Sequence, residues 1–243
     1  SALHAEFPHA VTAVDLLLRD LRDGKPIRLK PMLLVGSPGS GKSRMVRRLA
    51  ELTQQFVYRY DASSSSDNQF GGTGKGWSNT EPSVPARAVQ QSKTASPIVM
   101  IDELDKAAER NWNGRLWEAL LPFCDAETSR RYRDQSLDCE LDLSHVSYIA
   151  TANDVTGLPA PLRDRFRIVK VQTPDLRHLP LLASQVMVDL AAEDEIRHGD
   201  APLASDELEV IGRSWSKARF SMRALQKIVG ATLDARDRHA MRH

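Results

Sequence analysis

Apolar positions along the chain fall into two patterns that alternate between residues 11 and 171. Short apolar runs that end at polar residues are typical of strands buried in a parallel sheet. Apolar residues spaced three and four apart predict helices between those strands. Strands are expected from Met32 to the glycine-rich run that follows it, and at 56–60, 97–101, 146–150 and 168–171. Helices are expected at 11–21, at 44–52 and through Trp112, Leu116, Trp117, Leu120 and Leu121. This alternation predicts an α/β fold, a parallel sheet with helices on both faces.

Beyond Thr173 and Pro174 the strand pattern does not return. Helical spacing continues instead at 179–190, 206–215 and 222–233. The sequence therefore predicts three parts: an N-terminal helical linker segment (1–30), an α/β nucleotide-binding domain (31–173) and a small all-helical domain (174–243). Between 63 and 85 the composition shifts to Ser, Gly, Asn and Pro, which predicts a mobile surface loop.

The most informative motif is the glycine-rich turn that follows the first strand. Gly36, four residues and then Gly41-Lys42-Ser43 match the spacing of a P-loop. Glycines let successive backbone N–H groups turn toward phosphate oxygens, and the start of the next helix adds positive potential. Lys42 is expected on the β and γ phosphates, and the Ser43 hydroxyl on Mg²⁺. The alternative, a chance glycine-rich turn, is disfavoured because strand and helix both flank the motif. The expected phosphate-binding residues are Gly36, Ser37, Pro38, Gly39, Ser40, Gly41, Lys42 and Ser43.

Two other strands end in polar residues that fit the same chemistry. Asp102 and Glu103 follow the run at 97–101, and Asn153 follows the run at 146–150. The carboxyl ends of parallel strands meet at one edge of a sheet, so these residues are expected near the P-loop. Asp102 is predicted to help hold Mg²⁺ and Glu103 to polarise an attacking water. A solvated strand end is the alternative interpretation of the carboxylate pair.

Composition narrows the class of protein. The chain has 33 basic and 32 acidic residues, so no overall field recruits nucleic acid or an anionic membrane, although Arg44, Arg47 and Arg48 form a local cluster. No apolar run approaches the roughly 18 residues that a membrane span needs, and no signal-peptide pattern is present. Cys124 and Cys139 are too few for a metal or disulfide framework and fit a reducing cytoplasm. The chain starts at Ser1 without a methionine, as a processed chain or a fragment of a longer protein does.

From about residue 30 to 230 the chain resembles the AAA+ ATPases, and within them the ATPase module of Lon-type proteases. The resemblance rests on GSPGSGKS at 36–43, PIVMIDELDK at 97–106, DLSHVSYIATAN at 142–153, LPAPLRDRF at 158–166 and MRALQK at 222–227. The first two motifs are common among NTPases, whereas the third and fourth in this order point to Lon. The resemblance implies ATP and Mg²⁺ as cofactors, hydrolysis of ATP to ADP and phosphate, and a helical lid at 174–243.

Further roles follow from the resemblance alone. Asn153 matches the sensor-1 residue, which helps orient the water. Arg165 matches the arginine finger offered to a neighbouring subunit, with Arg163 as the alternative and a pairing with Asp164 as the ordinary structural role. Arg223 matches sensor 2 in the lid, with Arg219 as its nearby competitor.

A trans-acting arginine implies a homo-oligomer, in this family most often a hexameric ring. The segment 7–9 falls where the family places a segment beside adenine. Trp77 matches the pore-loop aromatic that grips a polypeptide substrate, although Ser78 follows it where the family usually has an aliphatic residue and packing on the loop base is the alternative. The loop at 130–133 is a second candidate for the pore, or an ordinary solvated loop.

No GxSxG elbow or Ser-Lys pair of a protease is evident in the sequence. An excised ATPase module, or a stand-alone relative, is therefore expected. The leading interpretation is an ATPase module that unfolds, translocates or remodels proteins, with no nucleic acid or membrane partner. Two rivals stay open: a nucleic-acid motor or loader, which would show salt-dependent DNA affinity, and a scaffold that binds ATP without turnover.

Overall fold

The computed structural model describes residues 1–63, 70–74, 80–108 and 116–240. Two compact units are distinguished by their internal contacts. One comprises 12–36 and 42–170, and the other comprises 1–11, 37–41 and 171–243. We call them the sheet unit and the helical unit. The boundary between them crosses the P-loop run twice, because residues 37–41 group with the helical unit while Gly36 and Lys42 group with the sheet unit.

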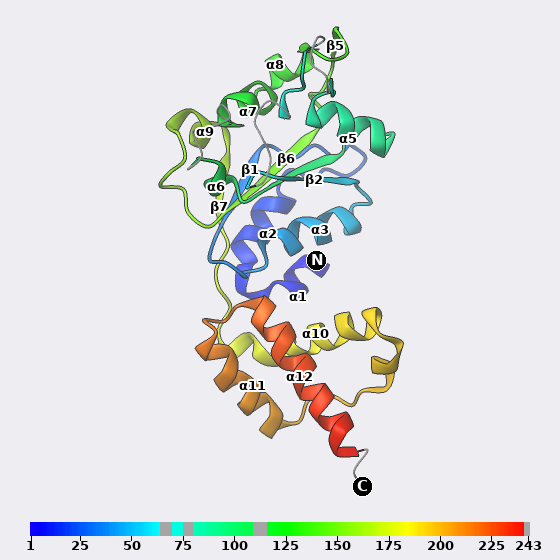
Figure 1. Cartoon of the computed structure of the whole chain (residues 1–243), viewed down its shortest axis with the longest axis vertical. Coiled ribbons are helices and arrows are strands. Elements are labelled where there is room, and N and C mark those ends of the chain that lie inside the picture. The colour runs from blue at the N-terminus through cyan, green and yellow to red at the C-terminus, as the bar shows by residue number, and fades with distance from the viewer. Residues whose placement is uncertain (64–69, 75–79, 109–115, 241–243) are drawn as a thin grey trace. The chain divides into compact units, whose positions relative to one another are not determined.

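Among the described residues, the sheet unit is built on five parallel strands in the order β2-β3-β6-β1-β7. Every β3 and β6 residue is buried, as central strands covered on both faces require. Figure 1 shows α5 on one side of this sheet and α2 and α3 on the other. The strands are β1 (Met32–Val35), β2 (Val57–Asp61), β3 (Ile98–Asp102), β6 (Ser147–Ala152) and β7 (Arg167–Lys170). The predicted α/β class with helices on both faces is confirmed.

The described helices of this unit are α2 (Val11–Leu18), α3 (Lys42–Leu52), α5 (Val84–Ser92), α6 (Leu104–Ala108), α7 (Leu116–Cys124), α8 (Ala126–Arg130) and α9 (Ala160–Arg165). Three of them, α2, α3 and α7, were predicted from the sequence, and the other four were not. In α3, Met45, Val46 and Leu49 are buried at spacings of three and four, and the helix packs on β3 and β6. Helix α7 contains Pro122 and buries Leu116, Leu120 and Phe123. Trp112, which was expected in the same helix, lies outside the described residues.

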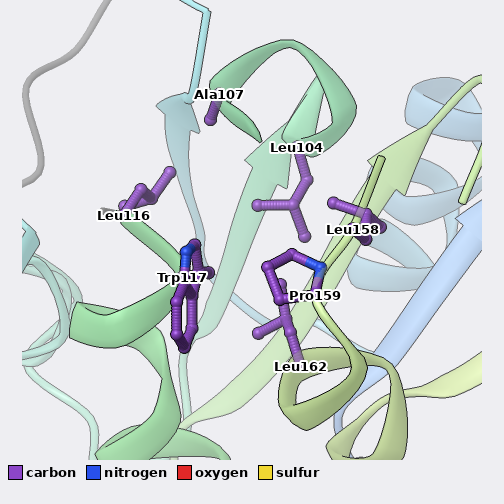
Figure 2. A pocket seen from close by; sticks show the side chains of 7 residues that line it. All are labelled: Leu104, Ala107, Leu116, Trp117, Leu158, Pro159 and Leu162. Atoms are coloured by element: carbon purple, nitrogen blue, oxygen red, sulfur yellow. The ribbon is translucent and has the colours of Figure 1, made fainter. Parts of the chain in front are cut away.

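A small apolar pocket marks where α9 packs beside α6 and α7. Figure 2 shows its lining side chains converging from these three helices and from the turn before α9. It has room for about one water molecule and is lined mainly by apolar atoms. The pocket therefore belongs to the packing that fixes α9, the helix that carries Arg163 and Arg165. The lining residues are Leu104, Ala107, Leu116, Trp117, Leu158, Pro159 and Leu162.

The helical unit contains the C-terminal helices predicted from the sequence. These are α10 (Leu179–Glu193), α11 (Ser205–Lys217) and α12 (Met222–Ala240), shown in yellow, orange and red in Figure 1. They close around Trp215, which is fully buried and donates its indole N–H to the carbonyl of Ser221 at 2.9 Å. The N-terminal α1 (Ala2–Glu6) and the 3-10 turns η1 (Pro8–Ala10), η2 (Leu176–His178) and η3 (Glu195–Gly199) complete this unit.

The predicted mobile surface loop at 63–85 is wrong at four described positions, Phe70, Ser83, Val84 and Pro85, all of which are buried. Phe70 is fully buried and stacks edge-on against Tyr60 and Phe123. Ser83 is also fully buried and caps α5, whose first residues include Pro85. Burial of one large aromatic side chain outweighs the local turn composition here, because a phenylalanine contributes about 2 to 3 kcal/mol when removed from water.

A short antiparallel hairpin was not predicted from the sequence. It pairs β4 (Tyr132–Asp134) with β5 (Cys139–Leu141). Asp134 is fully buried and accepts hydrogen bonds from the backbone N–H groups of Ser83, Ser136 and Leu137. Burial raises the pKa of the neighbouring Tyr132 to about 12, and its hydroxyl donates to the carbonyl of Gly71. These contacts tie the hairpin to the chain on either side of the 75–79 segment.

Candidate active site

Asp102 lies at the carboxyl end of β3 and collects hydrogen bonds from three other elements of the sheet unit. Its Oδ1 accepts from the Ser43 hydroxyl on α3 at 3.0 Å and from the Thr151 hydroxyl on β6 at 2.5 Å. Its Oδ2 accepts from Nη2 of Arg59 on β2 at 2.9 Å. The carboxylate is thus fixed in place by neutral donors on one oxygen and by a cation on the other.

Lys42 and Asn153 meet at the same edge of the sheet. Lys42 is buried at the first position of α3, where its Nζ donates to the carbonyl of Gly36 at 2.6 Å and to Oδ1 of Asn153 at 3.2 Å. The backbone N–H of Gly36 donates to the carbonyl of Ala152 at 3.2 Å, which extends the pairing of β1 and β6 past the strand ends. The sheet therefore brings the expected phosphate-binding lysine to the expected sensor-1 asparagine.

Glu103 follows Asp102 in the left-handed region of backbone space, with φ of 58°. A non-glycine residue in this region carries strain that concentrates at functional sites. Its backbone N–H donates to the Thr151 hydroxyl at 3.1 Å, and its carboxylate accepts from Nζ of Lys106 at 2.6 Å. The hydrogen bond to Glu103 raises the pKa of Lys106. The two neighbouring carboxylates therefore have different partners. Asp102 bonds to Ser43 and Thr151 at the edge of the sheet, and Glu103 bonds to Lys106 on α6.

Asn153 is held from the opposite side by Asp105. The backbone N–H of Asn153 donates to Oδ2 of Asp105 at 3.0 Å. Oδ1 of Asp105 is buried and has no hydrogen-bond partner within the part of the chain that the structure describes. A buried acceptor of this kind is costly in a fold and is frequent where a site receives another molecule.

The P-loop residues of the helical unit form a tight turn. Gly39 and Gly41 have φ of 79° and 91°, which a side chain would strain. The carbonyl of Gly39 accepts from the backbone N–H of Met222 at 2.8 Å. A Cβ on Gly39 would lie 2.3 Å from the Ser221 hydroxyl oxygen, so the turn also needs glycine for space. Within this unit, therefore, the P-loop turn is joined directly to the start of α12.

A buried histidine contacts the same turn. Nε2 of His9 lies 3.4 Å from the carbonyl oxygen of Ser40, and the ring stacks edge-on against Phe7 and His178. Phe7 itself comes within 3.6 Å of the position that a Cβ on Gly41 would take. Burial lowers the pKa of His9, and the nearby His178 lowers it further, so the ring is neutral near pH 7.

The three arginines with predicted roles all have exposed side chains. Arg163 and Arg165 lie on α9, and Nη1 of Arg165 is 3.5 Å from the carbonyl of Pro161, at the limit of a hydrogen bond. Arg223 is the second residue of α12. Its competitor Arg219 has φ of 53° in the turn before that helix. Trp77, the predicted pore-loop residue, lies outside the described residues.

Sequence reasoning missed three side chains that shape this site: Arg59, Thr151 and Asp105. Thr151 is a fully buried hydroxyl that bonds both to Asp102 and to the backbone of Glu103. Its signal was the run Thr151-Ala152-Asn153 directly after the apolar strand. Arg59 left a signal too, because a charged residue in the middle of an otherwise apolar strand needs a partner.

The oxygen donors at this edge suit a hard cation. Mg²⁺ prefers a few carboxylate or hydroxyl oxygens together with phosphate and water, and Ser43 and Asp102 are such donors. The Arg59 guanidinium on Oδ2 of Asp102 shows that this carboxylate already holds a positive charge. Within the described residues, no group of three or more His, Cys, Asp or Glu side chains is arranged to hold a metal ion.

This parallel sheet has a glycine-rich loop after its first strand, a lysine at the start of the following helix and an acidic residue at the end of β3, which is separated from β1 by β6. Together these features define the P-loop class of fold. The family model of the ATPase family associated with various cellular activities (AAA) matches residues 32–173. This match covers more than half of the chain, and the chain belongs to the AAA family.

Curated relatives of the chain include several Lon proteases. Lon protease 1 of Syntrophotalea carbinolica is 30% identical over 182 residues, which is 74% of this chain and 22% of that protein. Lon protease of Campylobacter jejuni is 29% identical over 78% of this chain and 23% of the relative. The human mitochondrial Lon protease homolog is 29% identical over 84% of this chain and 21% of its own length. The chain thus spans about a fifth of these relatives, and the resemblance to their ATPase region is confirmed.

In the described part of the chain, no helix combines the length and apolar character that crossing a membrane requires.

Proposed function

We propose that this chain binds Mg²⁺·ATP at the edge formed by β1, β3 and β6 and hydrolyses it to ADP and phosphate. The observation that carries the proposal is the Ser43 to Asp102 hydrogen bond beside the Lys42 to Asn153 contact. These pairs bring together four groups that phosphoryl transfer needs. They are a cation that binds the phosphates, two oxygen ligands for Mg²⁺ and a polar side chain that can orient the attacking water. AAA membership supports the same assignment.

Each residue has a defined task in this proposal. Backbone N–H groups of the 36–43 turn and the Lys42 ammonium bind the phosphates, while Ser43 and Asp102 hold Mg²⁺. The bound Mg²⁺ neutralises charge that develops on the phosphate oxygens. Glu103 accepts hydrogen bonds from the attacking water once its carboxylate leaves Lys106, and Asn153 orients that water. Arg223 is assigned to the terminal phosphate.

We further propose that the active form is a ring, most often hexameric in this family, with Arg165 completing the site of the neighbouring subunit. Two observations support it. Arg165 and Arg163 are exposed at the end of a short helix that is fixed by apolar packing (Figure 2). Within the described residues, the hydrogen bonding of the Arg165 side chain is limited to a 3.5 Å contact of Nη1 with the carbonyl of Pro161 in the same helix. A rigid helix that presents an arginine outward is suited to act in trans.

We propose that ring motion serves to unfold, translocate or remodel polypeptides, either as the motor of a Lon-like protease or as a stand-alone relative. The names of the relatives support a polypeptide substrate, since they are proteases. Trp77 would grip that substrate. Cys124 and Cys139 are unpaired thiols, which fits the cytoplasm as the compartment.

ATP turnover per subunit, measured over a wide range of protein concentrations, tests the ATPase and the ring together. Specific activity of the unsubstituted chain should rise with concentration. Arg165→Ala should bind a fluorescent nucleotide with unchanged affinity. Its specific activity should not rise with protein concentration and should stay about 10³-fold or more below that of the parent. Arg163→Ala, on the same helix, is the matched control and should keep most of the activity. Tight binding without turnover at any concentration would favour a scaffold instead.

A second experiment addresses the substrate. An unfolded, casein-like protein should stimulate ATP turnover, and Trp77→Ala should abolish that stimulation while leaving basal turnover unchanged. Trp117→Ala is not a suitable control, because Trp117 packs beside the core. The exposed Leu137→Ala in the β4–β5 turn is a better one, and it should respond to the unfolded protein as the parent does. Equal stimulation of the Trp77 variant would remove this residue from substrate binding.

A further inference from the structure

The ion pair between Arg59 and Asp102 has no part in the roles given above. Nη2 of Arg59 lies 2.9 Å from Oδ2 of Asp102. The two strands are adjacent, with Asp61 opposite Asp102, so Arg59 reaches forward along β2 from two residues upstream. The partners differ greatly in exposure: the Arg59 side chain is 65% exposed and that of Asp102 is 10% exposed.

This difference determines which partner can move. Asp102 ends a fully buried strand, and its other oxygen is fixed by the Ser43 and Thr151 hydroxyls. Arg59 is anchored by its backbone in β2, but its guanidinium lies at the surface and can turn into water. The carboxylate is therefore the fixed element of the pair, and the arginine is its exchangeable cation.

The bound guanidinium also sets the charge that an arriving metal meets. Ser43 and Thr151 are neutral donors and do not offset the negative charge of the carboxylate. The positive charge of Arg59 does offset it. With Arg59 in place the pair is neutral, and a dication gains less Coulomb energy on approach. Oδ2, the oxygen that Arg59 contacts, is the one that the two hydroxyls do not use.

We propose that Arg59 is a positioning residue that holds Asp102 ready in the absence of metal, yields Oδ2 when Mg²⁺ arrives, and thereby sets the Mg²⁺ concentration at which nucleotide binds. The inference rests on the proposed binding of Mg²⁺·ATP. It predicts competition between an internal cation and the metal, so removal of the arginine should strengthen Mg²⁺ binding. A purely supporting arginine predicts the opposite, because its loss would leave Asp102 less well placed.

The test is a Mg²⁺ titration of nucleotide binding, followed by the anisotropy of a fluorescent ADP analogue. The experiment needs no ATP hydrolysis. In Arg59→Gln the half-saturating Mg²⁺ concentration should fall about two- to fivefold, the range expected for losing one partly exposed ion pair. Binding of the same analogue in EDTA should be unchanged. Arg59→Lys keeps a cation at this place and should restore the parental Mg²⁺ dependence.

Arg133→Gln is the matched control. Arg133 pairs with Asp138 in the β4–β5 hairpin and has a side chain 64% exposed, close to that of Arg59. This variant should titrate like the parent. The proposal is overturned if Arg59→Gln needs the same or more Mg²⁺ than the parent, or if Arg59→Lys behaves like Arg59→Gln. Failure of the proposed function looks different, since the unsubstituted chain would then bind no analogue at any Mg²⁺ concentration, and both proposals would fall.

Discussion

Nζ of Lys42 donates a hydrogen bond to Oδ1 of Asn153, 111 residues further along the chain, at 3.2 Å. The contact joins the start of α3 to the end of β6. It holds a buried ammonium that also donates to the carbonyl of Gly36. Because acceptors on two different elements hold the ammonium, at 2.6 and 3.2 Å, it is oriented before any phosphate is present.

The first prediction distinguishes the role of Lys42 in nucleotide binding from the role of Asn153 in turnover. Lys42→Ala removes the cation that the phosphates require and should lower nucleotide affinity at least about tenfold. Asn153→Ala removes a group that orients the reaction and should lower turnover about 10- to 100-fold, with affinity changed by less than about threefold. Affinity is measured with a fluorescent nucleotide, and turnover by phosphate release.

The neighbouring Asp154 provides the control for Asn153. It is exposed and bonds within its own turn to Thr156, so Asp154→Asn should leave both quantities close to the parental values. Loss of affinity in Asn153→Ala equal to that in Lys42→Ala would contradict the division of roles.

The second prediction concerns the Thr151 hydroxyl. Thr151→Val has nearly the same shape but leaves the backbone N–H of Glu103 without its acceptor and Asp102 without one donor. An unsatisfied buried group costs about 1 to 3 kcal/mol, so the free energy of unfolding should fall by that amount. Turnover should also fall, because Glu103 is in a strained conformation that this bond stabilises.

Urea denaturation and phosphate release measure the two effects of Thr151→Val. Thr232→Val is the control, since its hydroxyl bonds to the carbonyl of Ile228 within α12, where the helix retains its own backbone hydrogen bonds. If both valine variants changed stability and turnover equally, Thr151 would have no special part in the site.

The central strands could be predicted from the sequence because both of their faces are buried. Every residue of β3 and β6 is buried, so the apolar run and the strand nearly coincide. Strand β6 continues two residues beyond the predicted 146–150, through Thr151 and Ala152. Those two residues are buried because they pair with β1 at the site edge, a tertiary contact that no local pattern reports.

Other features depend on contacts between distant segments. Strands β4 and β5 have three residues each and little apolar character, and the hairpin depends on the buried Asp134, which bonds to Ser83, 51 residues away. In the site, the motif spacing identified Lys42, Ser43, Asp102 and Asn153, whereas the partner of Arg59 follows only from the register of β2 on β3. Spacing along the chain locates a motif, but the partners of its side chains come from the sheet order.

The third prediction concerns the ion pair of Asp20 and Arg167, which joins the segment after α2 to β7. Nη1 and Nη2 of Arg167 lie 3.1 Å from the two carboxylate oxygens of Asp20, and both side chains are mostly buried. Asp20→Ala leaves the guanidinium without its counter-charge and also removes the acceptor of the Lys30 N–H. We expect a loss of about 2 kcal/mol in the free energy of unfolding, below the value for fully buried pairs because some solvent screening remains.

Chemical denaturation measures the effect of Asp20→Ala. The pair of Glu209 and Arg213 is exposed on α11, so Glu209→Ala should change stability by less than about 0.5 kcal/mol. A similar small loss in Asp20→Ala would mean that the Asp20–Arg167 pair contributes no more than a surface pair.

The last prediction is a pH dependence of stability that arises from His9. Burial lowers the pKa of His9 below 6.5, and the nearby His178 lowers it further, while the Ser40 carbonyl partly offsets both. The unfolded chain therefore binds a proton at higher pH than the folded chain does, and stability falls as the pH drops below about 6.5. Asp175, which faces His178, has its pKa lowered to about 2 mainly by Arg177, so it stays charged throughout this range.

In His9→Phe the fall in unfolding free energy between pH 7.5 and 5.5 should shrink, whereas His145→Gln, a change at an exposed histidine, should leave it as in the parent. Urea denaturation at several pH values measures this slope, and an unchanged slope in His9→Phe would assign the acid sensitivity to other groups.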